Sequence, residues 1–416
     1  MADSADIATP SRPATARFEK RKEAVLAAAI EVLNKEGLKG MTLAGVAARV
    51  HLTTTSLTYY YKRKELLAVD CFLHGLGRLE AMVEAAAKEP ELSGRIGALL
   101  DEHLALQIRV RDRREPPMTI FSDVRALSDE HRAPVAEAYL GLFDKVQALF
   151  AAPGYFHLDR LARAARAHML LEQLYWSSAW LARYDVEDFP RLRARMFDIL
   201  CKGLAGPGRS FAPTPLSIAP RPIDVGGGDA ASETFLRAAT PLINERSYRG
   251  ASVSSIAGRL NLTKGAFYHH MEAKDDIVVA CFDRTFEVIR ATQEAALSET
   301  PDQWQALSSA VASLVARQAE PDGLLLRFSA LQALPEALRA SAVWRADRVS
   351  QRFASMVADG AADGSIRAVD PFLAAQMVSA AVNAAADLIA WTPEGLTPER
   401  VTDVYARPAL MGLLIP

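Results

Sequence analysis

The stretch Thr42–Leu67, TLAGVAARVHLTTTSLTYYYKRKELL, predicts two short helices joined by a tight turn. Val46 and Ala47 lie on the apolar side of the first helix, and Leu57 begins the apolar side of the second. Thr53 stands where a side-chain oxygen can cap the second helix. The outer face of that helix then carries hydroxyl and aromatic side chains beside a basic cluster. This combination is suited to a helix that lies in a DNA groove.

The same pattern occurs a second time, 210 residues further along, as SVSSIAGRLNLTKGAFYHHMEAKDDI from Ser252 to Ile277. Without a gap, 13 of the 49 positions from Ala24 to Phe72 are identical in the two stretches. The identical pairs include Asn34–Asn244, Ala47–Ala257, Arg49–Arg259, Thr53–Thr263, Lys64–Lys274 and Cys71–Cys281. Most other apolar positions exchange one apolar residue for another. We therefore expect the chain to be an internal duplication.

Length and composition set the frame for both copies. A chain of 416 residues is expected to form two or three domains. It has no long uncharged apolar run and no secretory signal pattern, so we expect no membrane contact. The three cysteines, Cys71, Cys201 and Cys281, lie in apolar helical contexts and cannot all pair, which indicates a reducing cytoplasm. The net charge of −2 means that any contact with nucleic acid must come from a local basic patch.

Helical periodicity without useful strand alternation predicts an all-α fold for the whole chain. In each copy a three-helix head precedes a helical bundle, and the first head has helices at Lys20–Lys35, Leu43–Val50 and Thr54–Tyr60. The expected segments are a disordered tail at 1–16, a first head at 17–67, a first helical bundle at 68–204, a Pro/Gly-rich linker at 205–231, a second head at 232–277 and a second bundle at 278–416.

The two heads differ in charge. Between Arg17 and Leu67 there are ten basic and five acidic residues, a balance of 10 − 5 = +5. From Ser232 to Ile277 the balance is only 6 − 5 = +1. A local positive excess attracts phosphates and releases counterions on binding, so the first head is the stronger electrostatic anchor. In the second head, Pro241 falls in the middle of the first helix and predicts either a kink or a new helix start there.

The first head resembles the N-terminal DNA-binding domain of the TetR family of bacterial repressors. The residues that carry this resemblance are Thr42, Leu43, Val46, Ala47, Leu52, Thr53, Tyr59, Tyr60, Lys64 and Glu65. Two positions depart from the family pattern. The turn residue that is usually glycine is His51 here and Asn261 in the second copy, and the most typical tyrosine falls at Thr58, whereas the second copy keeps Tyr268. Histidine tolerates a left-handed turn poorly, so we expect some strain at His51.

The resemblance implies which residues contact DNA. Side chains at the start of the recognition helix lie nearest the base edges, whereas residues around it hold phosphates. In the first head these residues are Thr53, Thr54, Thr55 and Ser56 for the helix start, and Thr42, Tyr59, Tyr60 and Lys64 for the backbone. In the second head they are Thr263, Lys264 and Gly265 for the helix start, with Lys264 able to read guanine, and Ser252, Tyr268, His269, His270 and Lys274 for the backbone.

Two heads in one chain allow more than one arrangement on double-stranded operator DNA. The chain can form a pseudo-dimer by itself and read an asymmetric operator, because the two recognition stretches differ at nearly every outward position. Alternatively, two chains form a homodimer in which only the first head binds DNA. A third possibility is a helical protein-interaction or ligand-sensing module that does not bind DNA at all. Binding to DNA that weakens steeply with salt distinguishes the regulator from this last class.

By the same resemblance, the bundles hold a small-molecule effector and end in helices that form a dimer interface. Candidate effector residues are Gln107, Phe121, Tyr139, Phe143, His168, Glu172 and Trp176 in the first bundle, and Phe328, Gln332, Trp344, Asn383 and Asp387 in the second. They could orient an apolar ligand in a hydrophobic pocket. Equally, Glu172 and Trp176 could face Asn383 and Asp387 across the helices that join the two bundles, and we slightly favour this second interpretation.

The sequence contains no metal-ligand spacing, no Gly-x-Ser-x-Gly motif and no dinucleotide-binding fingerprint. The adjacent His269 and His270 are accounted for by phosphate contact. We therefore expect a ligand-released transcriptional repressor without a cofactor, and not an enzyme.

Overall fold

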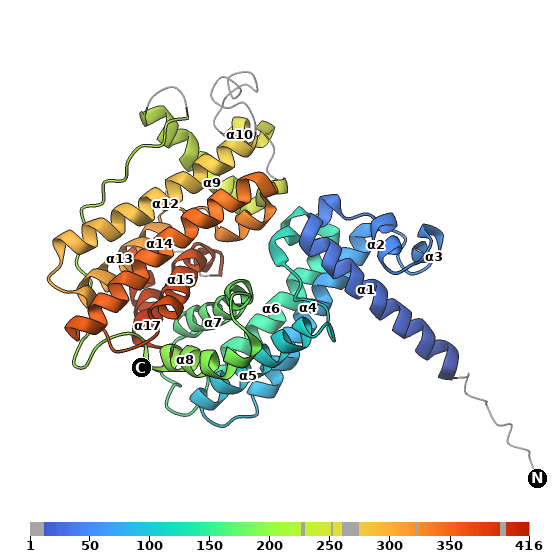
Figure 1. Ribbon diagram of the computed structural model, residues 1–416, viewed down its shortest axis with the longest axis horizontal. Coiled ribbons are helices and arrows are strands. Elements are labelled where there is room, and N and C mark those ends of the chain that lie inside the picture. The colour runs from blue at the N-terminus through green and yellow to red at the C-terminus, as the bar shows by residue number, and fades with distance from the viewer. Residues whose placement is uncertain are drawn as a thin grey trace, which may run out of the picture. The chain divides into compact units, whose positions relative to one another are not determined.

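The residues that the computed structural model describes (Figure 1) are 12–225, 229–250, 253–259, 274–320, 323–391 and 397–415. Within these ranges the chain forms helices, turns and one isolated bridge between Ala205 and Ile366, and no β-strand. The expected all-α class is therefore confirmed. The chain divides into two compact units. The first comprises residues 1–78 and 109–138, and the second comprises 79–108 and 139–416.

The first unit contains the first head. Its elements are α1 (Arg12–Gly40), α2 (Leu43–Arg49), α3 (Thr54–Thr58), the first part of α4 (Lys64–Ala86) and the 3-10 helix η1 (Phe121–Ala126). The two short helices α2 and α3 bury the apolar positions expected from the sequence, with Val46, Ala47 and Leu57 at most 1% exposed. This small core sets the angle between α2 and α3.

Helix α1 is longer than the sequence indicates. It begins at Arg12, within the segment 1–16 that was expected to be a tail, because Pro13 suits a first helical turn and alanine favours helix. Gly37 has φ 67° and interrupts the helical geometry where a C-cap was expected, and one further turn then reaches Gly40.

The second unit contains the remaining helices of the described residues. Its elements are most of α5 (Leu92–Arg111) and α6 (Asp129–Leu149), then α7 (Arg160–Leu181), η2 (Val186–Asp188), α8 (Phe189–Lys202), α9 (Asp229–Gly250), α10 (Val253–Arg259), α12 (Lys274–Glu299), α13 (Gln303–Gln318), η3 (Phe328–Ala333), α14 (Glu336–Asp363), α15 (Pro371–Trp391), α16 (Pro398–Val401), the π-helical turn η4 (Thr402–Ala406) and α17 (Arg407–Met411). Helix α7 packs against α15 (Figure 1). None of the described helices is both long enough and apolar enough to cross a membrane.

The linker expected at 205–231 is described over residues 205–225, which we call the strap. It has no regular secondary structure, yet its backbone is bonded along α12 and α13. Ser210 O accepts from Trp304 Nε1 at 2.8 Å, Thr214 N donates to Ser309 Oγ at 2.9 Å, and Arg221 N donates to Glu287 Oε1 at 2.9 Å. These bonds satisfy a backbone that no helix or strand satisfies. Helix α9 then begins at Asp229, three residues before the expected head boundary.

Pro241 does not end α9, so the new helix start predicted as one alternative at this position does not occur. The helix runs on from Asp229 to Gly250 with the proline inside it. Proline in a helix interior costs about 3 kcal/mol. The buried neighbours Leu236, Leu242 and Ile243 hold this part of the helix in the core, and the packing outweighs the local penalty.

Two aligned asparagines make the same pair of hydrogen bonds, one in each unit. Asn34 Nδ2 donates to Met118 O at 2.8 Å, and Asn34 Oδ1 accepts from Ile120 N at 2.9 Å. Asn244 Nδ2 donates to Leu325 O at 2.9 Å, and Asn244 Oδ1 accepts from Arg327 N at 3.1 Å. In both places the side chain ties the first helix of a head to the segment before a 3-10 helix.

Candidate nucleic-acid interface and effector pocket

Helices α2 and α3 are both fixed by threonine caps. Thr42 Oγ1 accepts from Gly45 N at 3.0 Å at the start of α2, and Thr53 Oγ1 accepts from Ser56 N at 3.1 Å at the start of α3. The predicted cap at Thr53 is therefore confirmed. Between the helices His51 adopts φ 54°, the left-handed conformation that was expected to be strained for histidine. The turn is thus built by side-chain caps and not by a glycine.

Three of the predicted contact residues of the first head lie on α3. Thr54, Thr55 and Ser56 are all exposed on α3. Ser56 Oγ is 2.9 Å from Thr53 Oγ1, so these two hydroxyls hold each other. Thr54 and Thr55 are therefore better placed than Ser56 to offer hydroxyl and methyl groups to base edges.

Phe18 packs against two more of the predicted contact residues, although the sequence pattern gave no reason to select it. Its ring stacks on Tyr60, with centroids 5.0 Å apart, and meets Tyr59 edge-on at 6.3 Å. Tyr59 is 79% exposed and Phe18 is 36% exposed. Phe18 lies on an early turn of α1, before Lys20, where the sequence predicts the first helix to begin. Because it supports both tyrosines, it orients their hydroxyl groups at the edge of the recognition surface.

Lys64, for which a phosphate contact was predicted, is bonded within its own head. Its ammonium group donates to three backbone carbonyls at the end of α1, namely Leu38 O at 2.9 Å, Met41 O at 3.2 Å and Lys39 O at 3.3 Å. An ammonium group has three donors, so all of them are used within the head. The exposed neighbours Lys62 and Arg63 are the basic side chains available to phosphates.

Most predicted contacts of the second head fall outside the described residues. These are Ser252, Thr263, Lys264, Gly265, Tyr268, His269 and His270, and of Lys274 only the backbone is described, at the start of α12. The described helix α10 buries Ile256 and Ala257, the counterparts of Val46 and Ala47 in α2.

The aligned arginines Arg49 and Arg259 both pair with a carboxylate on the first helix of their head. Arg49 Nη1 lies 3.2 Å from Glu31 Oε2. In the second copy, Pro241 stands at the position of Glu31. Arg259 lies 3.7 Å from Glu245 instead, one helical turn further along α9. The pairing is thus kept although its acidic partner has moved.

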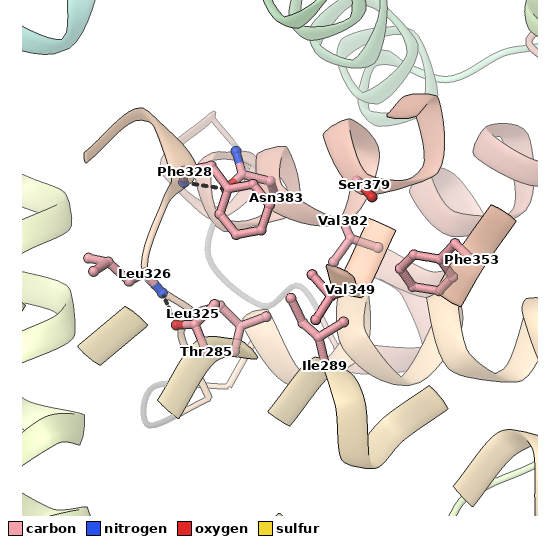
Figure 2. Close-up of a pocket in the computed structure, with 10 residues that line it drawn as sticks. All are labelled: Thr285, Ile289, Leu325, Leu326, Phe328, Val349, Phe353, Ser379, Val382 and Asn383. Carbon is pink, nitrogen blue, oxygen red and sulfur yellow. Dashed lines mark hydrogen bonds between the residues drawn. The ribbon is translucent and has the colours of Figure 1, made fainter. Parts of the chain in front are cut away.

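A small pocket lies among the helices of the second bundle (Figure 2). Its walls come from α12, α14, α15 and the segment before η3. The lining residues are Thr285, Ile289, Leu325, Leu326, Phe328, Val349, Phe353, Ser379, Val382 and Asn383. Most are apolar, and the polar ones are held on helices. The hydroxyl of Ser379 is buried and has no hydrogen-bond partner within the described structure. The pocket therefore suits a mainly apolar group with one hydrogen-bonding atom.

Two of the predicted effector residues, Phe328 and Asn383, line this pocket. Asn383 Oδ1 accepts from Phe328 N at 2.7 Å, so the amide also fixes the segment that forms one wall (Figure 2). Thr285 and Ser379 were not selected from the sequence. A single small hydroxyl residue on an otherwise apolar helix face gives little signal, because such residues are common in helix interiors.

Other predicted effector residues lie where α7 packs against α15. The ring of Trp176 meets Phe328 edge-on at 6.3 Å, and Asp387 forms an ion pair with Arg327. His168 Nε2 lies 3.0 Å from Ala384 O across the same contact. Burial raises the pKa of Glu172, and the nearby Asp387 adds to this shift. The predicted effector residues of this group thus lie at the contact between α7 and α15, and none of them lines the pocket.

The remaining effector candidates are scattered. Gln107 donates to Ser178 Oγ at 2.9 Å, Tyr139 stacks on Phe143 at 6.2 Å, and Phe121 packs against Phe72 at 5.9 Å within the first unit. Trp344 is 58% exposed, with the Arg348 guanidinium over its ring. The side chain of Gln332 lies outside the described residues. Among the described side chains of this group, none lines the pocket of the second bundle.

Comparison with known proteins finds two family models in the second half of the chain. A model described as bacterial regulatory proteins, tetR family, matches residues 235–281, and one described as tetracyclin repressor-like, C-terminal domain, matches residues 300–413. The transposon Tn10 TetC protein of Escherichia coli is 31% identical over 77 residues, which is 18% of this chain. The chain spans 39% of the length of that curated relative.

Among solved structures, the chain is similar to the TetR-family regulator PfmR from Thermus thermophilus, with 26% identity and a TM-score of 0.36 over 43% of this chain and 98% of that chain. It is also similar to the regulator FadR from Bacillus subtilis, crystallised with stearoyl-CoA, with 18% identity and a TM-score of 0.32 over 42% of this chain and 95% of that chain. The second head and most of the second bundle are therefore similar to the two parts of a TetR-family regulator.

Proposed function

We propose that this protein is a DNA-binding transcriptional regulator, a repressor that a small molecule releases from its operator. The observation that carries the proposal is the capped pair α2 and α3, whose short core leaves Thr54 and Thr55 exposed at the start of the second helix. A helix presented in this way can enter a major groove with its N-terminal side chains against base edges. The local charge balance of 10 − 5 = +5 supports phosphate contact around it.

In this proposal Thr54, Thr55 and Ser56 read bases, while Thr42, Tyr59 and Tyr60 hold phosphates together with Lys62 and Arg63. In the second head Lys264 reads guanine, and Gly265 allows a close approach of the backbone. The phosphate contacts of the second head are Ser252, Tyr268, His269, His270 and Lys274.

We further infer that the chain is a tandem duplication that forms a pseudo-dimer by itself. The gapless alignment of the two heads and the identical bonding of Asn34 and Asn244 support the duplication. Hydrogen bonds between α7 and α15 support the pseudo-dimer, since Gln173 Nε2 donates to Met377 O at 2.8 Å inside this contact. Each half then supplies one of the paired helices that a homodimer draws from two chains.

The effector that fits the pocket of the second bundle is a small, mainly apolar molecule. Ile289, Val349 and Phe353 offer it apolar contacts, and Ser379 can supply a hydrogen bond. Such a molecule would regulate binding if it prefers the conformation that does not fit the operator.

Selection of bound DNA from a random pool, combined with light scattering of the free protein, tests the proposal. We expect an asymmetric site of two different halves, bound by one chain, with an affinity that falls steeply as salt is added. A palindromic site bound by two chains would instead indicate that only one head reads DNA. No enrichment at any salt concentration would overturn the proposed function.

A further inference from the structure

The short segment Leu325–Phe328 lies between the second head and the pocket. It has no regular secondary structure up to Arg327, which is extended, and Phe328 begins the 3-10 helix η3. On one side, Leu325 O and Arg327 N are both bonded to the side chain of Asn244 on α9. On the other side, Leu326 N donates to Thr285 Oγ1 at 2.9 Å, and Phe328 N donates to Asn383 Oδ1 at 2.7 Å (Figure 2).

The two sides of this segment therefore face different parts of the protein. Thr285 and Asn383 line the pocket, as do the side chains of Leu325, Leu326 and Phe328. Asn244 is 7% exposed and lies on the helix that opens the second head. The Asn244 side chain both donates to and accepts from this one backbone segment. Breaking either hydrogen bond is costly because the groups are buried. A displacement of the segment is therefore expected to move Asn244 with it.

We infer that Asn244 is the positioning residue through which occupancy of the pocket reaches the second head. A group that enters the pocket competes with Leu326 N and Phe328 N for Thr285 and Asn383, or presses on the side chains of the segment. The segment then shifts, and Asn244 carries the shift into α9. The inference rests on the proposed function, in which α9 positions a DNA-reading head.

The first unit supplies a matched control. Asn34 holds residues Met118 and Ile120 with the same two bonds, but it belongs to the other head. Substituting Asn34 thus removes the same chemistry without touching the pocket of the second bundle. Any loss of coupling that is specific to Asn244 cannot be ascribed to the general removal of a buried asparagine.

The test uses a filled pocket in place of the unidentified effector. In the full chain, Ser379→Leu puts a larger side chain into the pocket, and two readouts follow: affinity for the operator selected from random DNA, and hydrogen exchange of the α9 backbone. We expect Ser379→Leu to weaken operator binding at least tenfold and to speed exchange in α9. In the Asn244→Ala background the same change should alter affinity less than twofold, whereas in the Asn34→Ala background it should keep its full effect.

Asn244→Asp keeps the acceptor for Arg327 N and loses the donor to Leu325 O, so it replaces Asn244→Ala if that variant does not fold. The inference is overturned if Ser379→Leu changes neither readout, if its effect persists without the Asn244 side chain, or if Asn34→Ala removes the effect equally. If the wild-type chain selects no operator, the proposed function fails. Exchange in α9 then still decides whether the pocket and this helix are coupled.

Discussion

At the scale of single residues, the hydrogen bonds of Lys64 change the role expected for it from binding phosphate to stabilising the head. Lys64→Ala leaves three carbonyls at the end of α1 without their charged donor. We expect it to lower the free energy of unfolding by about 1–3 kcal/mol, since hydrogen bonds to charged groups contribute in this range. Chemical denaturation measures this loss. Lys62→Ala, at an exposed neighbouring position, should instead weaken DNA binding and leave stability unchanged. If Lys64→Ala weakens DNA binding and leaves stability unchanged, Lys64 contacts phosphate after all.

His51 gives a second prediction at this scale. A residue other than glycine with φ 54° pays a steric penalty between its Cβ and the backbone, of roughly 1 kcal/mol. The side chain is exposed, so His51→Gly removes the penalty and sacrifices few contacts. We expect the midpoint of urea unfolding to rise. Val50→Gly serves as the comparison, because Val50 has φ −103° and gains nothing from glycine. Equal destabilisation by both substitutions would show that the turn is not strained.

At the scale of helices, the sequence predicts best what local chemistry determines. Helix α15, Pro371–Trp391, follows from local sequence, because a proline opens it and a long apolar, alanine-rich run follows. The strap at 205–225 and the capping role of Lys64 could not be predicted in this way. Their bonds join residues far apart in the sequence, such as Lys64 and Leu38 or Ser210 and Trp304, and no local pattern encodes such partners.

The same distinction between local and long-range contacts decides which residues of the candidate sites could be predicted. Thr53 was predicted as a cap because a cap acts within one helical turn. Of the effector candidates, Phe328 and Asn383 lie in the pocket, while Glu172, Trp176 and Asp387 lie at the α7–α15 contact. Periodicity places a residue on a face of its helix, but it does not say which neighbouring helix covers that face.

Glu172 gives the prediction that belongs to α7. Burial raises the pKa of this carboxyl group in the folded state, so folding favours its protonated form. The stability linked to Glu172 is then complete below its unfolded pKa and is lost as pH rises through the folded value. Glu172→Gln removes this dependence, and we expect it to stabilise the protein more at pH 8 than at pH 4.5 in thermal unfolding. The exposed Glu102→Gln should show no such difference; an equal response would refute a buried charge at Glu172.

At the scale of the whole molecule, the two halves are joined by more than the strap. Leu204 N donates to Leu410 O at 2.7 Å, and Leu413 N donates to Leu200 O at 2.7 Å. The buried Arg166 donates to Leu413 O at 3.2 Å and to Ile415 O at 3.0 Å. The end of the chain thus closes on α7 and α8 of the first half, in addition to the contact between α7 and α15.

Cutting the chain tests whether these contacts act as a dimer interface. A protease site inserted at the exposed turn beside Gly208, where a side chain would meet nothing, separates residues 1–207 from the rest. Because the α7–α15 contact does not depend on the peptide link, we expect the two fragments to elute together at micromolar concentration. Linkage provides an effective concentration in the millimolar range. The apparent operator affinity of the cut protein should therefore fall when dilution separates the fragments, whereas the intact chain should show one affinity at all protein concentrations.

Arg166→Met makes this test specific to the interface. In the intact chain the substitution leaves the halves linked, and light scattering should still report one chain of 45.2 kDa. In the cut protein it removes a buried donor from the carbonyls of Leu413 and Ile415, so the fragments should separate at a concentration at which the cut wild type stays whole. Fragments that separate at once without the substitution would mean that the halves are held only by the strap. The pseudo-dimer would then have no interface of its own, because an interface that forms only under tethering contributes little free energy of association.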